Sequence, residues 1–230
     1  MKLTERLARI PLFQGLPEAQ VREIATLIVE QEFRRGQTIF SEGDPGSGFY
    51  IVASGRVKVF KLSLEGKEQI LHIFGAGQPF GEVPVFAGES FPAHAEALEK
   101  SRIFFLDRGD FADLIRKEPS LAMNMLAVLS LRLRQFTRLI EDLSLKEVPG
   151  RLAAYLLYLS QRQGESNELE LDISKGHLAS ILGTIPETLS RIFAKISQAG
   201  LVEVRGRRIV VLDRPGLEAL AAEGKLLLEG

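Results

Sequence analysis

The chain has 230 residues, of which 45% are hydrophobic and 26% charged, with a formal net charge of −1. These values are typical of a globular protein with one large or two small domains, and they argue against disorder or a fibrous class. The absence of cysteine excludes disulfides, thiolate zinc sites and cysteine-ligated iron–sulfur clusters. Because the chain lacks a bilayer-length apolar run and a secretory signal, we expect a cytoplasmic protein without a membrane partner.

The first half of the chain changes from a helical to a strand-like pattern. Residues 4–12 and 17–31 have helical spacing of apolar side chains, so we predict two short helices there. Residues 33–106 contain brief β-rich runs separated by glycines about ten residues apart, which is typical of an all-β sandwich or barrel. We predict a jelly-roll β-barrel over this region.

A short helix at 108–116 precedes a long one, predicted from Pro119 to about Leu143. Apolar residues in the long helix alternate steps of four and three, the a/d spacing of a two-stranded coiled coil. A buried monomeric helix is the alternative, but so regular an alternation favours a homodimer. A second stripe, which includes Met125 and Leu139, remains to pack on the barrel. The predicted dimer interface consists of Leu126, Leu129, Leu133, Phe136, Ile140 and Leu143.

Pro149 and Gly150 end the helical pattern, so we place a hinge at residues 145–150. A helix at 151–161, a polar loop and a strand-like LELDI run follow, and residues 214–230 have a helical pattern without a motif.

Residues 173–212 carry the most informative pattern in the chain. Two short helical segments break at Gly183–Thr184, and two strand-like runs joined by RGRR follow. A glycine at the turn allows two helices to meet at a steep angle, and Pro186 suits the first turn of the second helix. This order predicts a helix-turn-helix with a β-hairpin wing.

The second helix of this motif has one apolar face and one polar face. Glu187, Ser190, Arg191 and Lys195 share the polar face, whose chemistry suits base edges in the major groove. Between residues 174 and 212 there are six basic against two acidic residues, which makes the local charge positive. The predicted DNA-binding residues are Thr184, Pro186, Glu187, Thr188, Ser190, Arg191, Lys195, Arg205, Arg207 and Arg208.

The order of barrel, long helix and winged helix-turn-helix resembles the Crp/Fnr superfamily of bacterial transcription regulators over roughly residues 8–213. The most specific segments are GDPGSGFYIVASGRVKVF at 43–60, FGEV at 80–83 and PETLSRIF at 186–193. Glu187, Ser190 and Arg191 match the recognition helix of the Fnr-like branch. The resemblance implies double-stranded DNA with a palindromic site of TTGA- or TGTGA-like half-sites, a homodimer, and RNA polymerase as a partner if the protein is an activator.

In cyclic-AMP-binding members of that family, a Gly-Glu pair begins the nucleotide cassette and an Arg-Ser pair about ten residues later holds the phosphate. Gly81 and Glu82 match the first pair, but Phe91 and Pro92 stand where the second is expected. Without its guanidinium, a buried cyclic phosphate loses a charge-assisted contact of about 1.5–3 kcal/mol, which disfavours cyclic AMP. The expected effector pocket consists of Gly81, Glu82, Val83, Phe91, Met123 and Met125.

The SLK, YLL and IPETLSRI segments resemble the nitric-oxide-responsive Dnr/HcpR branch, which implies haem as the gas-binding cofactor. A neutral imidazole is a good iron ligand, so His72 and His94 are the candidate haem ligands. Each could instead be a partly buried strand histidine bonded to a backbone carbonyl. Because the three histidines lie far apart in sequence without a zinc-binding spacing, we expect no metal other than haem iron.

No P-loop, GxSxG or dinucleotide motif is present, so we do not expect an enzyme. A sensor whose output is protein contact would carry an acidic or apolar recognition helix, which the basic residues here argue against. The sequence thus predicts an α+β transcription regulator with a sensing domain at 1–117, a dimerisation helix and hinge at 118–147 and a DNA-binding domain at 148–230. Nitric oxide acting through haem is the expected signal; the alternatives are a cyclic nucleotide or another small apolar ligand.

Overall fold

A computed structural model describes residues 2–224. Within it the chain divides into two compact units, one made of residues up to 61 together with 71–135, the other of residues 62–70 together with those from 136 on. The expected domain boundaries at 117/118 and 147/148 remain a prediction. Residues 225–230 of the expected DNA-binding domain lie outside the described chain. No helix among residues 2–224 is long and apolar enough to cross a membrane.

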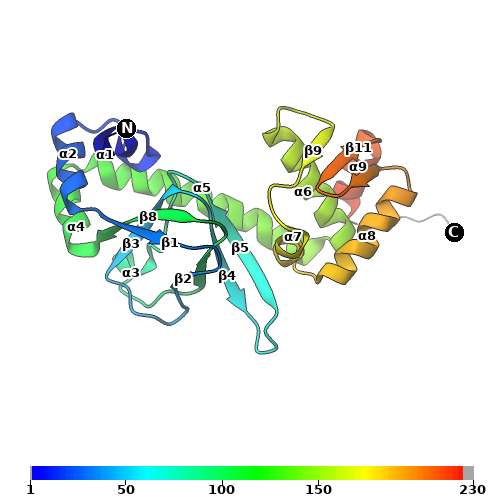
Figure 1. The fold of residues 1–230 in the computed structure, drawn as a ribbon, viewed down its shortest axis with the longest axis horizontal. Coiled ribbons are helices and arrows are strands. Elements are labelled where there is room, and N and C mark those ends of the chain that lie inside the picture. The colour runs from blue at the N-terminus through cyan, green and yellow to red at the C-terminus, as the bar shows by residue number, and fades with distance from the viewer. Residues whose placement is uncertain (1, 225–230) are drawn as a thin grey trace. The chain divides into compact units, whose positions relative to one another are not determined.

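The β-rich region forms two four-stranded antiparallel sheets (Figure 1). One has the order β1-β8-β3-β6, with strands Val29–Phe33, Ser101–Asp107, Gly48–Ser54 and Pro79–Phe80. The other has the order β2-β7-β4-β5, with strands Thr38–Phe40, His94–Ala97, Val57–Leu62 and Glu68–Phe74. The jelly-roll prediction is confirmed, although the sheets form an open sandwich rather than a closed barrel.

Two hydrophobic clusters hold this unit together. One contains Phe40, Phe80 and Phe91 with Val52 and Ile103. The other packs the helices against the first sheet and includes Phe49, Phe104, Phe111, Leu121 and Met125. Its helices are α1, the 3-10 turn η1, α2, α4 and the first part of α5, at Leu3–Leu7, Pro11–Phe13, Glu18–Leu27, Arg108–Lys117 and Ser120–Leu145.

Two local predictions in this unit were wrong, and two short elements were missed. The helix expected over 17–31 ends at Leu27, because Val29–Phe33 pairs antiparallel with residues 101–105 of β8 as strand β1. The helix expected over 4–12 is split into α1 and η1. The sequence also gave no sign of the two-residue strand β6 or of α3, a single turn at Val83–Phe86.

The second unit contains a three-stranded sheet, β10-β11-β9, and four further helices (Figure 1). The strands are Val202–Arg205, Arg208–Val211 and Glu168–Glu170; helices α6 to α9 are Val148–Arg162, Lys175–Ile181, Pro186–Gln198 and Arg214–Glu223.

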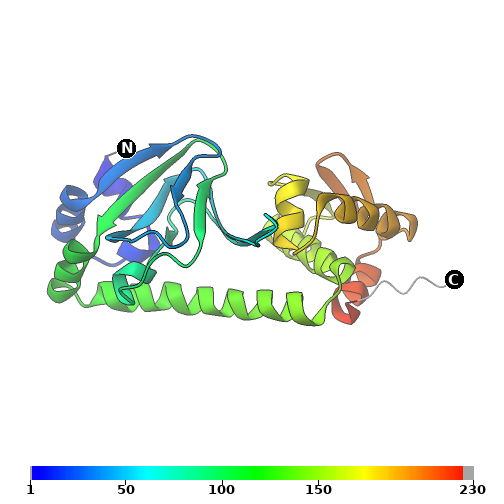
Figure 2. The same cartoon turned by 90° about the horizontal axis from the view of Figure 1, so that it is seen from below.

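Helix α5 is a single continuous helix of 26 residues, in agreement with the long helix predicted from the sequence (Figure 2). The hinge predicted at 145–150 is shorter than expected, because Val148, Pro149 and Gly150 form the first turn of α6. Only Lys146 and Glu147 separate α5 from α6. Proline is tolerated there because the first helical N–H groups have no partner within the helix. Arg151 donates hydrogen bonds to the carbonyl oxygens of Leu143 (3.3 Å) and Lys146 (2.9 Å), which caps the end of α5.

Candidate effector site and nucleic-acid interface

A buried ion pair lies where α5 meets the sandwich. Arg132 Nη1 is 2.7 and 2.8 Å from the two carboxylate oxygens of Glu82, and its Nη2 donates to the carbonyl oxygen of Pro79 at 2.5 Å. The guanidinium also lies 4.7 Å from the centre of the Phe74 ring. The two side chains are only 13% and 8% exposed. Removing one partner of such a pair costs about 3–5 kcal/mol, because a charge is left buried without compensation.

Aromatic rings fill the space next to this pair. Phe91 stacks on Phe40 with ring centres 3.8 Å apart and planes 10° apart, and Phe80 and Tyr50 pack beside them. Gly81 lies against the rings with φ +73°, and a Cβ there would be 3.1–3.3 Å from Phe40, Phe91 and Tyr50. The sequence needs glycine here both for its backbone conformation and for the close approach of the rings.

The predicted pocket residues are only partly brought together. Gly81, Glu82 and Phe91 gather as expected, and Val83 begins α3 directly after Glu82. Met125 instead packs in the cluster around Phe111 and Leu121 on the helical side of the unit. Met123 is 65% exposed. Neither methionine belongs to the aromatic cluster of Phe40, Phe80 and Phe91.

Arg132 is the functional residue that the sequence interpretation missed. A signal was present, because Leu121, Met125, Val128 and Arg132 follow steps of four, three and four along one face of α5. A single cation that continues an inward apolar stripe needs a buried acidic partner. Glu82, already recognised, is that partner.

The two histidines proposed as haem ligands lie on different strands and in different surroundings. His72 on β5 contacts the edge of Phe74 with ring centres 4.5 Å apart. Burial, with a smaller contribution from the nearby charge of Arg132, lowers the pKa of His72 to about 4, so it is neutral at physiological pH. His94 on β7 accepts a hydrogen bond at Nδ1 from the Glu42 backbone N–H (3.2 Å), while its Nε2 is 3.8 Å from the Glu42 carboxylate.

The surroundings of His94 do not fit a haem ligand. Both ring nitrogens of His94 face Glu42, and the ring stacks on Phe60. Cavities of about 570 and about 220 Å³ occur in the described chain, and neither is lined by a histidine. Within residues 2–224, no group of three or more histidine and acidic side chains is placed to hold a metal ion.

In the second unit, α8 presents the polar face predicted from its sequence. Leu189, Ile192, Phe193 and Ile196 are buried on one side of α8. Glu187, Ser190, Arg191 and Lys195 are exposed, while Thr184 and Thr188 are partly buried. The Ser190 hydroxyl donates to the carbonyl oxygen of Pro186 (2.9 Å), so it can offer only its lone pairs to another group. Arg191 remains the exposed guanidinium of this face.

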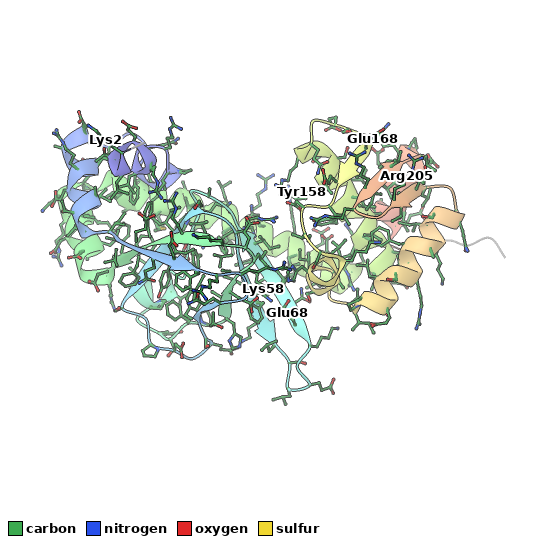
Figure 3. All side chains as sticks on the ribbon, in the orientation of Figure 1. Lys2, Lys58, Glu68, Tyr158, Glu168 and Arg205 are labelled. Atoms are coloured by element: carbon green, nitrogen blue, oxygen red, sulfur yellow. The ribbon has the colours of Figure 1, made fainter. Side chains whose placement is uncertain are left out.

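The three arginines of the wing have different surroundings. Arg207 donates from Nε and Nη2 to the carbonyl oxygen of Leu171, at 3.0 and 2.6 Å, and so ties the wing to the segment before α7. Arg205 forms two hydrogen bonds of 2.8 Å with Glu203, and Figure 3 labels it and Glu168 in the same small sheet. Arg208 lies exposed at the start of β11. Of the three, Arg208 has the side chain most available to a ligand.

Helix α5 leaves apolar side chains in solvent. Leu126, Leu133 and Ile140, three members of the predicted seam, are 56%, 68% and 63% exposed in the single chain. Leu129, a fourth member, packs partly on the core cluster instead. Exposed apolar residues at regular spacing on one helix are typical of a protein–protein contact.

Comparison with known proteins identifies both parts of this arrangement. Residues 30–118 match the cyclic nucleotide-binding domain family, and residues 150–220 match the Crp-like helix-turn-helix domain family. The chain is 31% identical over 215 residues to a CRP-like cAMP-activated global transcriptional regulator of Mycobacterium tuberculosis, covering 92% of this chain and 96% of that protein. The protein belongs to the Crp/Fnr family of DNA-binding transcription regulators.

Other Crp/Fnr relatives carry different names. The cyclic AMP receptor protein of Thermus thermophilus is 34% identical over 211 residues, covering 92% of this chain and 96% of that protein. The fumarate and nitrate reduction regulatory protein of Escherichia coli is 29% identical over 211 residues, covering 90% and 84%. The structure of FixK2 from Bradyrhizobium japonicum matches with a TM-score of 0.71 at 26% identity, covering 84% of this chain and 96% of that one. These relatives support the family and do not distinguish a nitric-oxide-responsive branch within it.

The surroundings of His72 generate a pH prediction for this Crp/Fnr regulator. The pKa of His72 is about 4 in the folded chain, whereas the ordinary value of 6.5 applies in the unfolded chain. Between these two pH values the unfolded chain therefore binds more protons than the folded chain. The free energy of unfolding therefore rises with pH across this window. We expect His72→Gln to reduce this increase in the free energy of unfolding by about 2 kcal/mol. The effect is smaller than the one calculated from the full pKa difference, because part of the His72 ring is exposed to solvent.

Urea unfolding followed by circular dichroism at pH 4.5 and 7.5 measures this effect. Equal pH dependence in wild type and His72→Gln would contradict the assignment.

Proposed function

We propose that this regulator binds a palindromic DNA site as a homodimer, reads bases with α8, and is controlled by a small ligand at the aromatic cluster beside Glu82. The observation that carries the DNA part is the exposed polar face of α8, held in place by four buried residues on its other side. Arginine can donate two hydrogen bonds to guanine O6 and N7, and a carboxylate can accept from cytosine N4. The resemblance of Glu187, Ser190 and Arg191 to the Fnr-like pattern favours TTGA- or TGTGA-like half-sites.

The exposed seam on α5 supports the homodimer. A two-fold dimer places its recognition helices about one duplex turn, or 34 Å, apart and therefore prefers a palindrome. RNA polymerase is the further partner if the regulator is an activator.

The contacts around Glu82 favour an apolar effector. Arg132 already neutralises the Glu82 carboxylate, and Phe91, stacked on Phe40, stands at the position of the phosphate-binding arginine of cyclic-AMP-binding relatives. A small apolar ligand next to Phe40 and Phe91 would keep the ion pair satisfied. To act as a switch, the ligand must bind the DNA-competent state more tightly than the other state of the protein. A change in the population ratio of the two states from 1:99 to 99:1 needs a difference in binding free energy of about 5.5 kcal/mol.

Two other effectors have specific support. Relatives named as cAMP-activated or as a cyclic AMP receptor favour a cyclic nucleotide. Neutral His72 favours haem and nitric oxide, because an uncharged imidazole is the form that binds iron. Haem binding would require side chains around His72 to move, since its surroundings are packed with Phe74 and Arg132.

Arg191→Ala tests base reading by α8. We expect binding to a palindromic site to weaken by about 1–3 kcal/mol and the preference at one base pair of each half-site to relax, because a base-specific contact is lost. Fluorescence anisotropy with a panel of single-base variants measures both effects. Arg208→Ala is the comparison: it should weaken all sites alike and reduce the salt dependence of binding by about one counterion. If Arg191→Ala also weakens all sites equally, Arg191 contacts phosphate and does not read bases.

Ile140→Glu tests the dimer seam. Ile140 is 63% exposed in the single chain, so the change should leave the fold of each subunit intact. It places a charge against its symmetry mate, and we expect monomers in sedimentation-velocity ultracentrifugation and loss of binding to palindromic DNA. Leu131→Glu is the matched control, because Leu131 is 62% exposed but lies off the seam. A dimer that survives Ile140→Glu, or dissociates equally in both variants, would disprove the seam.

Ligand titrations of the purified protein distinguish the effectors. We expect neither a thermal shift with cyclic AMP nor a saturable Soret band with haem, because Arg132 is already paired with Glu82 and His72 is packed against Phe74. A cyclic AMP shift that disappears in Glu82→Gln would favour the nucleotide. A Soret band, saturating at one haem per subunit, that shifts with nitric oxide and weakens in His72→Ala would favour the gas sensor.

A further inference from the structure

A cavity of about 570 Å³ lies in the unit that contains the sandwich, and Glu82, Phe40, Phe80 and Phe91 are not among its lining residues. It is formed where the start of the chain meets the two inner strands of the β1-β8-β3-β6 sheet. Its lining comes from α1 and the turn after it, from β3, from the loop before β6 and from β8. The lining residues are Arg6, Arg9, Ile10, Val52, Ala53, Ala76, Gly77, Arg102 and Phe104.

Three guanidinium groups line this cavity, and none of its lining residues is acidic. Glu30 on β1 accepts from Arg6, whose Nη2 is 3.3 Å from Oε1, and the same oxygen is 3.6 Å from Arg102 Nη1. One carboxylate thus lies between two arginines. Arg9 is exposed and forms no ion pair with the described residues, so positive charge is left in excess at the mouth.

The rest of the wall is apolar and built from small residues. Arg6 lies 4.9 Å over the ring of Phe104, which fixes its guanidinium at the wall, and its side chain is only 18% exposed. The register of β3 on β8 shifts between Val52 and Ser54, so Ala53 has no cross-strand partner there. Small side chains at Ala53 and Ala76, together with Gly77, leave the space unfilled.

From this combination we propose that the cavity binds a small organic anion, with its anionic oxygens on Arg9, Arg6 and Arg102 and its apolar body against Ala53 and Ala76. Guanidinium groups bind carboxylate, phosphate and sulfonate oxygens with charge-assisted hydrogen bonds, and the apolar wall removes the rest of the ligand from water. The site lies on the opposite side of β3 and β8 from the cluster of Phe40 and Phe80, and it is separate from the proposed function.

Binding of 1-anilinonaphthalene-8-sulfonate to the full-length protein tests the proposal, because this probe joins one anionic group to an apolar body and fluoresces when it leaves water. We expect saturable binding that weakens with added salt. Arg9→Gln should weaken binding about tenfold, since one charge-assisted contact is lost. Ala53→Leu should weaken it comparably by filling the cavity. N-phenyl-1-naphthylamine, the same body without the sulfonate, should bind at least tenfold more weakly.

Arg22→Gln is the matched control, because Arg22 is an exposed arginine of the same unit outside the cavity. It should bind the probe as the wild type does. Circular dichroism and DNA binding establish that each variant is folded. Equal affinity in Arg9→Gln, Ala53→Leu and Arg22→Gln would place the probe elsewhere, for example on the apolar seam of α5, and overturn the proposal. Equal affinity of the neutral compound would overturn the anionic class of ligand.

Discussion

The ion pair between Arg132 and Glu82 is the constraint on which the sensing unit depends. Two charges that are almost completely removed from water are tolerated only when each satisfies the other. Arg132 belongs to α5 and Glu82 to the turn before α3, so the pair fixes the long helix to the start of α3. The exposed seam lies on this same helix. A ligand that disturbs the pair therefore acts directly on the element proposed to join two subunits.

The aromatic cluster complements this electrostatic constraint. Phe91 forms a stacked pair with Phe40. Gly81 permits the rings to approach the backbone. This part of the unit thus combines one neutralised ion pair with packed aromatic rings. The arginine-lined cavity near the start of the chain has the opposite character, which is why we assign the two sites different ligands.

In the DNA-binding part, arginines with the same charge have different roles. The guanidinium of Arg207 is bonded to the Leu171 carbonyl and positions the wing, and that of Arg205 is paired with Glu203. Arg191 and Arg208 keep exposed side chains. A count of the basic residues in the segment overestimated how many of them are free to meet a nucleic acid.

The sequence by itself determined the features that depend on local periodicity. Most strands of the sandwich, the long helix, the two helices of the DNA-binding motif and the polar face of α8 follow from spacings of two and of three to four residues. Motifs that match residue by residue, such as Gly81–Glu82 and Glu187, Ser190 and Arg191, also pointed to the family.

Only the tertiary structure decided which side chains meet across long stretches of chain. Strand β1 forms because residues 29–33 pair with β8, although the local pattern continues that of a helix. Arg132 reaches Glu82 fifty residues away, and Arg207 reaches Leu171 thirty-six residues away. The positions of Met125 and His94 were likewise set by partners elsewhere in the chain. Such contacts depend on burial and charge compensation in the assembled fold, which local periodicity does not encode.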